Sequence, residues 1–466
     1  MEQQEIQTLR ALMEYEAART EPPESFPHLP DVPAGRYTDP RFFELEQAEI
    51  FKKSWLFAAH LDEIPEPGCY MKWEQAGEPV VLVHTEQGEV KAFYNVCSHR
   101  GAPVVTEPKG KRLRLTCKYH GWSYSLNGEL KAIKDPEDFR DLDFSCRSLA
   151  DIRCETFGKF IFVNFDPDAV SLLDWLGPIA DEWREFQFDQ CRLSARHSFD
   201  LECNWKIAME AFIESYHAIQ THPQILSFPG GDNSQYDVFG DHLSRTITAQ
   251  GIPNPGQADR YSVQESVEAM TGPGGFERAQ ELTGLDADTI TSRQAIGAVR
   301  RDEFAAFMSP EMLATVTDAE TMDSILYLVF PNFAPWGGFQ SQITYRYRPD
   351  GMNPDGCIMD IYLLDGFAAD QPRPADAKTI RLDYDQKYAD ADGLGLLGAL
   401  FDQDAGNLPE VQRGLMASKS RKAITASYQE LRIRHFHETL AKYLACLLYT
   451  SPSPRDQRGS RMPSSA

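Results

Sequence analysis

The sequence predicts an α+β fold, in which a small antiparallel β domain is followed by a larger domain with a sheet wrapped by helices. Three observations support this prediction. Runs rich in β-forming residues and separated by turn signals fill the region between about residues 68 and 165. A helical pattern begins at Trp205, and β-rich runs return between 324 and 364. With 466 residues, the chain has room for more than one domain of about 100–200 residues.

The composition is that of a globular protein with a strongly acidic balance. Hydrophobic residues make up 42% of the chain, and the formal net charge is −24. A sequence pI near 4.9 argues against nucleic-acid binding, which requires basic surfaces. The nine cysteines are an odd number without the spacing of a disulfide framework. We find neither a leader pattern nor a run of about 18 apolar residues, so we expect a cytoplasmic protein without membrane contact.

The first part of the chain is predicted to comprise an N-terminal segment, residues 1–49, and the β domain, residues 50–165. The N-terminal segment combines a weak helical pattern with a proline-rich stretch, and we expect it to pack on the larger domain. A helix is predicted from Asp39 to Phe57, with Pro40 at its first position. The strands of the β domain are expected at 79–84, 90–96, 112–116, 122–124 and 160–165.

Two short segments of the β domain each carry one cysteine and one histidine. The first reads Cys97-Ser98-His99-Arg100-Gly101, and the second reads Cys117-Lys118-Tyr119-His120. Glycine follows both pairs and indicates tight loops, so four ligands can meet between the two loops. Two thiolates on one iron and two imidazoles on the other are typical of one kind of [2Fe–2S] cluster. A tetrahedral zinc site is the alternative, although zinc fingers usually present both cysteines before both histidines.

The larger domain, residues 166–445, is predicted to mix helices and strands. Helices are expected at 171–186, 205–219 and 415–445, and strands at 196–201, 324–330, 341–348 and 357–364. Between about 250 and 320 the composition favours helices and loops. The final residues, 446–466, become rich in proline, serine and arginine and resemble translated adapter sequence. We therefore expect a non-native, disordered tail there.

A second candidate metal site lies in the larger domain. In a helix over 205–219, Glu210, Glu214 and His217 share one face, where buried carboxylates require a partner or a metal ion. His222 precedes Pro223, which disfavours helix there and allows the chain to turn His222 toward His217. Two histidines and one carboxylate form the facial triad of non-haem Fe(II) sites that react with O₂. The alternative for these residues is a solvated helix face.

The residues of both motifs, in this order, resemble the large (α) subunit of Rieske non-haem iron aromatic-ring-hydroxylating oxygenases. The resemblance covers about residues 40–445. It implies Cys97, His99, Cys117 and His120 as ligands of a Rieske [2Fe–2S] cluster. It also implies a helix-grip catalytic domain whose mononuclear iron is held by His217, His222 and Asp404, with Asp402 as the alternative carboxylate.

The resemblance further implies how such a protein obtains electrons. They come from NAD(P)H through a separate reductase, sometimes with a ferredoxin, and pass from the cluster of one subunit to the iron of its neighbour. The expected assembly is a homotrimer, or a trimer that also contains β subunits. Glu214 takes the position of a carboxylate that bridges His120 of one subunit and His217 of the next. Glu210 is a candidate for supporting the metal ligands.

The expected activity is the mono- or dihydroxylation of an aromatic or other apolar substrate with O₂. Oxidative demethylation, or action on a quaternary amine, is an alternative within the same class of enzyme. An electron-transfer Rieske protein without catalysis is an alternative of another class. The sequence lacks a glycine-rich dinucleotide fingerprint, so we expect no direct use of NAD(P)H. Candidates for a substrate pocket are Phe228, Tyr236, Phe239, Leu328, Phe333, Trp336 and Phe339.

Overall fold

The computed structural model describes residues 30–306, 308–339, 343–366 and 378–450, together with four isolated positions before residue 30. The predicted tail lies outside this part of the chain from residue 451 onward, as does most of the proline-rich stretch of the N-terminal segment. No helix among these residues has both the length and the apolar character of a membrane span.

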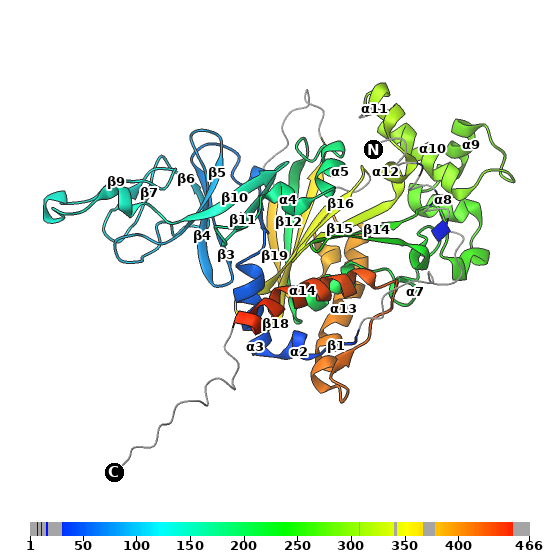
Figure 1. Ribbon diagram of the computed structural model, residues 1–466. Coiled ribbons are helices and arrows are strands. Elements are labelled where there is room, and N and C mark those ends of the chain that lie inside the picture. Colours follow the sequence, from blue (N-terminus) through cyan, green and yellow to red (C-terminus); the bar gives the residue numbers. More distant parts are fainter. Residues whose placement is uncertain are drawn as a thin grey trace, which may run out of the picture.

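A β lobe at one end of the molecule is built on seven strands (Figure 1). In spatial order they are β2 (Leu56–His60), β11 (Phe160–Asn164), β10 (Asp151–Phe157), β5 (Val90–Tyr94), β4 (Glu78–His84), β3 (Cys69–Gln75) and β6 (Lys109–Lys111). A small sheet of β7 (Leu115–Thr116), β8 (Ser123–Tyr124) and β9 (Leu130–Ala132) lies at the outer end of the lobe. All pairings within these two sheets are antiparallel. The lobe therefore matches the predicted small antiparallel β domain.

An eight-stranded sheet forms the centre of the larger domain. Its order is β13 (Gln235–Phe239), β14 (Leu243–Thr248), β15 (Ser324–Val329), β16 (Phe333–Gly337), β17 (Ile343–Asp350), β18 (Asn353–Asp365), β12 (Arg192–Leu201) and β19 (Lys378–Leu382). Only the β12–β19 pair in it is parallel. The long strands have almost continuous buried runs, since helices cover them.

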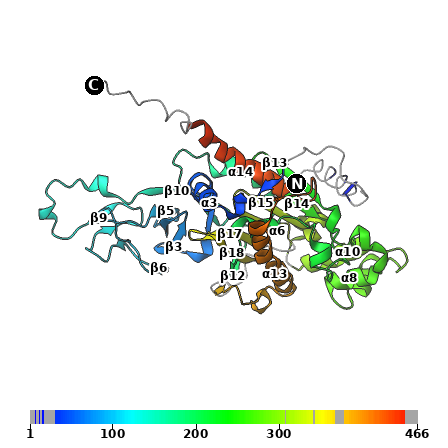
Figure 2. The ribbon, with the colours of Figure 1, turned by 90° about the horizontal axis from the view of Figure 1, so that it is seen from below.

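Three groups of helices surround this sheet. The site-bearing helices are α6 (Trp205–Phe212), α7 (Ala218–Thr221), α13 (Leu396–Ala417) and α14 (Leu431–Thr450). An inserted group with its own small core contains α8 (Val263–Thr271), α9 (Gly275–Thr283), α10 (Ser292–Phe304), α11 (Pro310–Thr315) and α12 (Asp318–Met322). Figure 2 shows this group at the end of the molecule opposite the β lobe. The α+β prediction, including helices between 250 and 320, is therefore confirmed.

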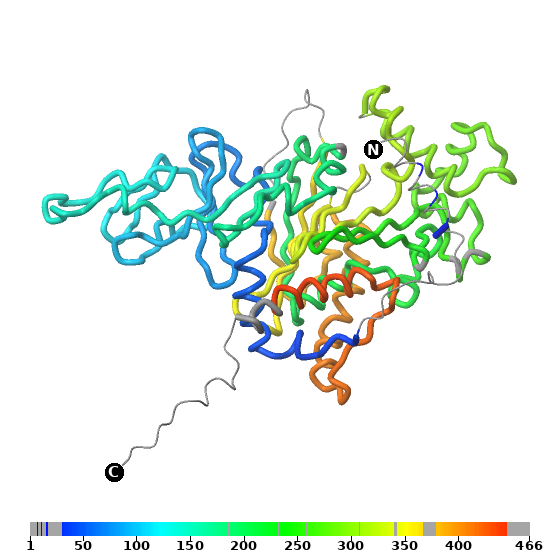
Figure 3. Tube along the Cα trace, viewed as in Figure 1, coloured from blue at the N-terminus to red at the C-terminus, as the bar shows by residue number. Residues whose placement is uncertain are grey.

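The remaining helices connect the ends of the chain to this core. They are α2 (Gly35–Thr38) and α3 (Pro40–Glu46) near the N-terminus, and α4 (Leu172–Leu176) and α5 (Ile179–Glu185) after the β lobe. A short bridge pairs β1 (Val32–Pro33) with β20 (Lys422–Ala423), so the blue and orange segments of Figure 3 meet there. The domain boundaries themselves remain predictions.

Two predicted helices were wrong at one end. The helix expected from Asp39 to Phe57 gives way to a π-helical turn over Gln47–Phe51, and Leu56 already begins β2. Short apolar runs of this kind do not distinguish a buried strand from a helix. The helix expected at 415–445 is instead the end of α13 and a separate α14, because Arg421 has a positive φ of 53° and the chain turns into β20.

A buried arginine of the larger sheet joins it to the β lobe by hydrogen bonds. Arg346 on β17 donates from Nη1 to the carbonyl oxygens of Phe57 and Ala58 on β2, and its guanidinium pairs with Asp360 on β18 at 2.7 Å. Both charged side chains are almost inaccessible to solvent. Burial alone raises the pKa of Asp360, but the neighbouring guanidinium groups of Arg346 and Arg348 outweigh it and hold this pKa far below its usual value. The contact between the two domains is thus made by a charged arginine that Asp360 of its own sheet compensates.

Replacing Arg346 with methionine should destabilise the protein strongly, because two buried carbonyl groups and part of the Asp360 charge lose their partner. We expect the free energy of unfolding to fall by about 3–5 kcal/mol, measured by denaturant titration. The matched control is Arg381→Met, which breaks the more exposed pair with Asp200 and should cost about 1 kcal/mol or less. Equal losses for the two variants would contradict a coupling role for Arg346.

Candidate metal centres

The two Cys/His loops of the β lobe share one backbone design. In the first loop the Cys97 N–H donates to the Ala102 carbonyl at 2.8 Å, and the Gly101 N–H donates to the Cys97 carbonyl at 2.9 Å. The second loop repeats these bonds at 2.9 and 3.0 Å between the corresponding residues Cys117, Trp122 and Gly121. Both glycines have a left-handed φ, 79° and 75°, that other residues rarely adopt. The sequence motif therefore encodes two equivalent tight loops.

These loops bring the four predicted cluster ligands to one place. Cys97 and Cys117 are buried, and the imidazole rings of His99 and His120 have centroids 4.4 Å apart. Burial raises the pKa of the Cys97 thiol, and the neighbouring Cys117 adds to this effect. Among the described residues, His99 Nδ1 is buried and has no hydrogen-bond partner. Two adjacent thiols and an unpaired ring nitrogen suit a positively charged metal group, and we propose these four residues as cluster ligands.

Two aromatic side chains support the first loop. Tyr124 Oη lies 3.2 Å from Cys97 Sγ and accepts a hydrogen bond from the Ser98 N–H at 3.0 Å. Trp122 stacks on the His99 ring with a centroid distance of 4.8 Å and an interplanar angle of 7°. Tyr124, on the strand after the second loop, therefore supports the first loop at its thiol. Trp122, within the second loop, supports it at its imidazole.

The second site depends on the early end of α6. The helix predicted over 205–219 is wrong beyond Phe212, because the side chain of Glu214 accepts a hydrogen bond from the His217 N–H at 3.2 Å. Such local side-chain bonds compete with helical backbone bonds. A separate short helix, α7, then places His222 at its C-terminal end. The three residues Glu210, Glu214 and His217 consequently do not share one helix face.

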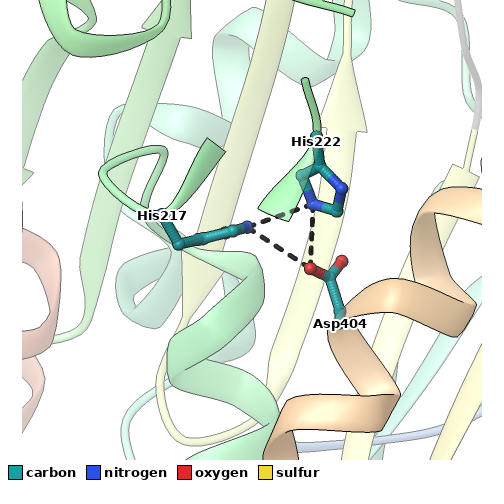
Figure 4. Close-up of side chains that lie close together, drawn as sticks. All are labelled: His217, His222 and Asp404. Carbon is teal, nitrogen blue, oxygen red and sulfur yellow. Dashed lines mark hydrogen bonds and ion pairs between the residues drawn. The ribbon is translucent and has the colours of Figure 1, made fainter. Parts of the chain in front are cut away.

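His217, His222 and Asp404 meet at one point (Figure 4). The two imidazole Nε2 atoms are 3.3 Å apart, and Asp404 Oδ1 lies 3.4 Å from His217 Nε2 and 2.9 Å from His222 Nε2. With metal–ligand bonds of about 2.1 Å and angles near 90°, ligand atoms are about 3 Å apart. This triangle therefore fits a facial triad, and we propose these three residues as the iron ligands.

Neighbouring acceptors orient both imidazoles. Glu214 Oε1 lies 2.5 Å from His217 Nδ1, and Gln403 Oε1 lies 2.8 Å from His222 Nδ1. Since a carboxylate and an amide oxygen can only accept, both Nδ1 atoms carry hydrogen and both Nε2 atoms face the triad. Sequence reasoning missed Gln403, although its position directly before Asp404 on α13 was an available signal.

The predicted fallback ligand, Asp402, has a different role. Its carboxylate accepts hydrogen bonds from the backbone N–H groups of Tyr388 and Ala389 at 2.7 and 3.3 Å. Residues two apart on a helix point in directions about 200° apart, so Asp402 and Asp404 face different neighbours. Gly398 allows this contact, because a Cβ there would lie 2.7 Å from the Tyr388 carbonyl oxygen. Asp404 is therefore the carboxylate of the triad.

The triad attracts positive charge. Burial alone lowers the pKa of His217, but hydrogen bonds to Asp404 and Glu214 outweigh it and raise this pKa to about 10. Burial likewise raises the pKa of Asp404, yet the two histidines bring it below its usual value. Two carboxylates around two imidazoles thus form a site that a divalent cation suits.

A cavity of about 420 Å³ opens on one side of the triad. Apolar and aromatic side chains make up most of its wall, and its aromatic members are Phe212, Phe228, Trp336, Tyr345 and Phe401. Of the seven predicted pocket residues, Phe228 and Trp336 line it. The other five, Tyr236, Phe239, Leu328, Phe333 and Phe339, are not among its lining residues.

A smaller cavity of about 250 Å³ lies beside the same triad, and three glutamates are among its mostly apolar lining residues. Glu214, His217 and Asp404 line both cavities, while Glu210 and Glu430 line the smaller one. Burial, together with the charges of Glu214 and Glu210, raises the pKa of Glu430 to about 7. Glu210 does not contact the metal ligands, since it binds Tyr37 and His437 instead.

The fold and the two sites define a class of iron protein, in which a Rieske [2Fe–2S] domain is joined to a domain with a mononuclear iron. Residues 54–144 match the Rieske [2Fe-2S] domain family. Residues 188–446, more than half of the chain, match the family described as ring hydroxylating alpha subunit (catalytic domain). The chain belongs to this family, and its cofactors are the Rieske cluster and a mononuclear iron.

Three similar proteins illustrate the range of the family. The glycine betaine monooxygenase oxygenase subunit of Chromohalobacter salexigens is 34% identical over 196 residues, 42% of this chain and 44% of the relative. The large oxygenase component of the 2,4-dinitrotoluene dioxygenase system of Burkholderia sp. is 34% identical over 255 residues, 50% and 54% of the two chains. The match thus spans about half the length of these relatives. A quaternary ammonium Rieske monooxygenase structure with L-carnitine shares the fold, with a TM-score of 0.60, 18% identity and coverage of 89% and 95%.

Replacing Asp404 with alanine should empty the mononuclear site and leave the cluster intact, because Asp404 provides one of the three donor atoms. Iron content should fall from about three to about two atoms per chain, while the visible absorption of the cluster is retained. Iron analysis and absorption spectroscopy measure both quantities. The control Asp402→Asn should keep all three irons. Loss of iron in the control alone would reverse the assignment of the two carboxylates.

Proposed function

We propose that this chain is the oxygenase component of a Rieske oxygenase system and hydroxylates a small organic substrate with O₂. The observation that carries this proposal is the position of the His217, His222 and Asp404 donor atoms at the wall of a largely apolar cavity of about 420 Å³. A facial triad leaves open coordination positions for O₂. A mononuclear iron held there supplies O₂ activation with electrons stored in the cluster.

The residues of the chain position the reactants. Apolar and aromatic walls hold the substrate beside the triad and exclude bulk water. Gln403 and Glu214 fix the two imidazoles, so their Nε2 lone pairs point to the same place. The inserted helices contribute Ala269, Met270 and Arg300 to the wall, so they close the cavity on the side away from the β lobe.

Electrons are proposed to reach the triad from a neighbouring subunit. Within one chain, the small sheet beside the cluster loops lies at the outer end of the β lobe, far from α7 and α13 (Figure 1). Glu214 lies at His217 Nδ1 and lines both cavities, while Nε2 of the same ring faces the triad. In a homotrimer, alone or with β subunits, Glu214 would bridge His120 of one subunit and His217 of the next. A separate NAD(P)H-dependent reductase, with or without a ferredoxin, supplies the cluster.

Two classes of substrate are compatible with the cavity. Its apolar wall supports an aromatic or other apolar molecule, as the name of the dinitrotoluene relative suggests. Five aromatic side chains also offer ring faces to a quaternary ammonium group, which cation–π contacts stabilise. The name of the glycine betaine relative supports this second class, for which the product is a demethylated amine.

Product formation should require an added reductase, because the proposed oxygenase has no dinucleotide-binding motif in its sequence. We expect no product from the purified protein with NADH alone. With a surrogate Rieske-system reductase and ¹⁸O₂, we expect ¹⁸O in the hydroxylated product, or in the aldehyde released by demethylation when exchange with water is limited. Candidate substrates from both classes are tested, and the class that gives product shows whether the substrate is an apolar molecule or a quaternary amine. Reduction of the cluster without any O₂-dependent product from either class would favour the electron-transfer alternative.

Replacing Glu214 with glutamine should separate iron binding from turnover, because it removes the charged acceptor at His217 Nδ1 while keeping a similar shape. We expect the product rate with reductase to fall by about 10- to 100-fold, with both iron centres retained. The rate at which the reduced cluster is reoxidised, measured by rapid mixing, shows whether the lower product rate comes from slower electron transfer. The control is Glu210→Gln. Glu210 does not contact His217, so this variant should keep the rate of cluster reoxidation of the unmodified protein. Unchanged reoxidation in Glu214→Gln would contradict the bridging role.

A further inference from the structure

A fully buried arginine lines the cavity beside the metal triad. Arg432 lies near the start of α14 and has no measurable exposure to solvent. It is one of the lining residues of the 420 Å³ cavity, together with Thr246 of β14. Charged side chains are rarely buried completely unless a group of opposite charge accompanies them. The contacts of this side chain therefore indicate what the cavity can accept.

Three hydrogen bonds hold the guanidinium, and all of them go to neutral groups. Nε donates to Ser244 Oγ at 3.1 Å, and Nη1 donates to Thr246 Oγ1 at 2.8 Å and to the Ile213 carbonyl at 3.1 Å. Within the described part of the chain, Nη2 is buried without a hydrogen-bond partner and no carboxylate pairs with Arg432. One edge of the planar group is therefore fixed, while Nη2 is enclosed without a partner beside the cavity that Arg432 lines.

Two buried arginines of the eight-stranded sheet are paired with acids. Arg245, which precedes the cavity-lining Thr246 on β14, binds both Glu182 and Asp237. Arg346 binds Asp360. Their environments show how this protein usually compensates a buried guanidinium, and Arg432 lacks that compensation. Burial lowers the pKa of Arg432 to about 9, so the group still carries its charge at neutral pH.

A second unpaired group lies in the same neighbourhood. Tyr347 Oη on β17 is buried and has no hydrogen-bond partner among the residues that the structure describes. Tyr347 and Arg432 interact electrostatically, although Tyr347 is not among the lining residues of the cavity. Thr248, Gln250 and Ser324 add polar groups to the cavity wall along β14 and β15. The cavity thus has an apolar side and a side with hydrogen-bond donors and a positive charge.

We propose that Arg432 forms an anion subsite of the substrate cavity and that the substrate carries a carboxylate that pairs with its Nη2 atom. This inference rests on the proposed function, because it specifies the substrate of the same site. A carboxylate matches the planar guanidinium, and a charge-assisted bond is stronger than one to a neutral acceptor.

The subsite and the metal triad belong to one cavity, since Arg432 and the three triad residues all line it. Arg432 holds the Ile213 carbonyl, and the backbone from Ile213 to His217 can span at most about 14 Å. A substrate anchored by its carboxylate therefore presents a fixed carbon to the triad. Both an aromatic acid and a betaine with a carboxylate meet this requirement.

The test compares a carboxylate with its neutral amide in the holoenzyme. The probes are benzoate with benzamide, and 4-(trimethylammonio)butanoate with its carboxamide, measured by titration calorimetry without reductant. In the unmodified protein we expect the carboxylate of at least one pair to bind about tenfold or more tightly than its amide. Arg432→Gln should remove this preference, and Arg432→Lys should restore part of it.

The matched control is Arg300→Gln, which removes another cavity guanidinium whose charge is already paired with Glu303; it should keep the carboxylate preference. Equal affinities for acid and amide in the unmodified protein would overturn the proposal. This outcome does not depend on whether the Arg432 variants fold. A buried water would then be the partner of Nη2. Loss of the preference in Arg300→Gln alone would also overturn it. Carboxylate binding through Arg432 without O₂-dependent product would instead reject only the proposed function.

Discussion

Asp404 lies against two imidazoles in a part of the molecule that is otherwise mostly apolar. Burying a carboxylate beside His217 and His222 is unfavourable unless a cation or protons accompany it. The surrounding structure nevertheless orients every donor atom of the triad. Glu214 and Gln403 occupy the Nδ1 positions, so both Nε2 atoms turn inward. The architecture of the larger domain is consistent with the requirement to hold one cation at this point.

Three segments far apart in the sequence must keep their positions for the triad to form. The end of α6 at Phe212 releases the chain, and Arg432 of α14 then holds the Ile213 carbonyl. On the other side, Gly398 allows α13 to approach the Tyr388 carbonyl closely. The triad is thus supported by tertiary contacts rather than by the local structure of the motif. Changes at Arg432 therefore act on the loop as well as on the cavity, which is why acid and amide probes are compared.

The sequence predicted the parts of this protein that depend on local residue chemistry. The paired Cys/His motifs and the glycines after them indicated two tight loops, and the loops have the same hydrogen bonds. The three predicted iron ligands also meet, although the helix that was expected to carry two of the carboxylates ends early. The Glu214 side chain competes for the His217 N–H, a contact that a hydrophobic pattern does not reveal.

Features that depend on long-range packing were not predictable in the same way. Asp402 and Asp404 are equivalent as residue types, and only the direction of α13 separates a backbone cap from a member of the triad. Five of the seven aromatic and apolar pocket candidates do not line the cavity, because apolar residues do not indicate which side of a sheet faces a cavity. Leu328 and Phe333 belong to the core, and Phe239 and Phe339 pack against it. Gln403 and Arg432 carried no motif at all.

The triad lies beside two mostly apolar cavities that differ in the charged residues that line them, and this difference bears on the tasks proposed for the site. The larger cavity is mostly apolar, with a single unpaired guanidinium at Arg432 among its described lining residues. Glu210 and Glu430 line the smaller one, and Glu214 and His217 line both. A substrate carboxylate is repelled by the glutamates and attracted by Arg432. These charges would favour a substrate carboxylate on the Arg432 side of the triad, away from Glu210 and Glu430.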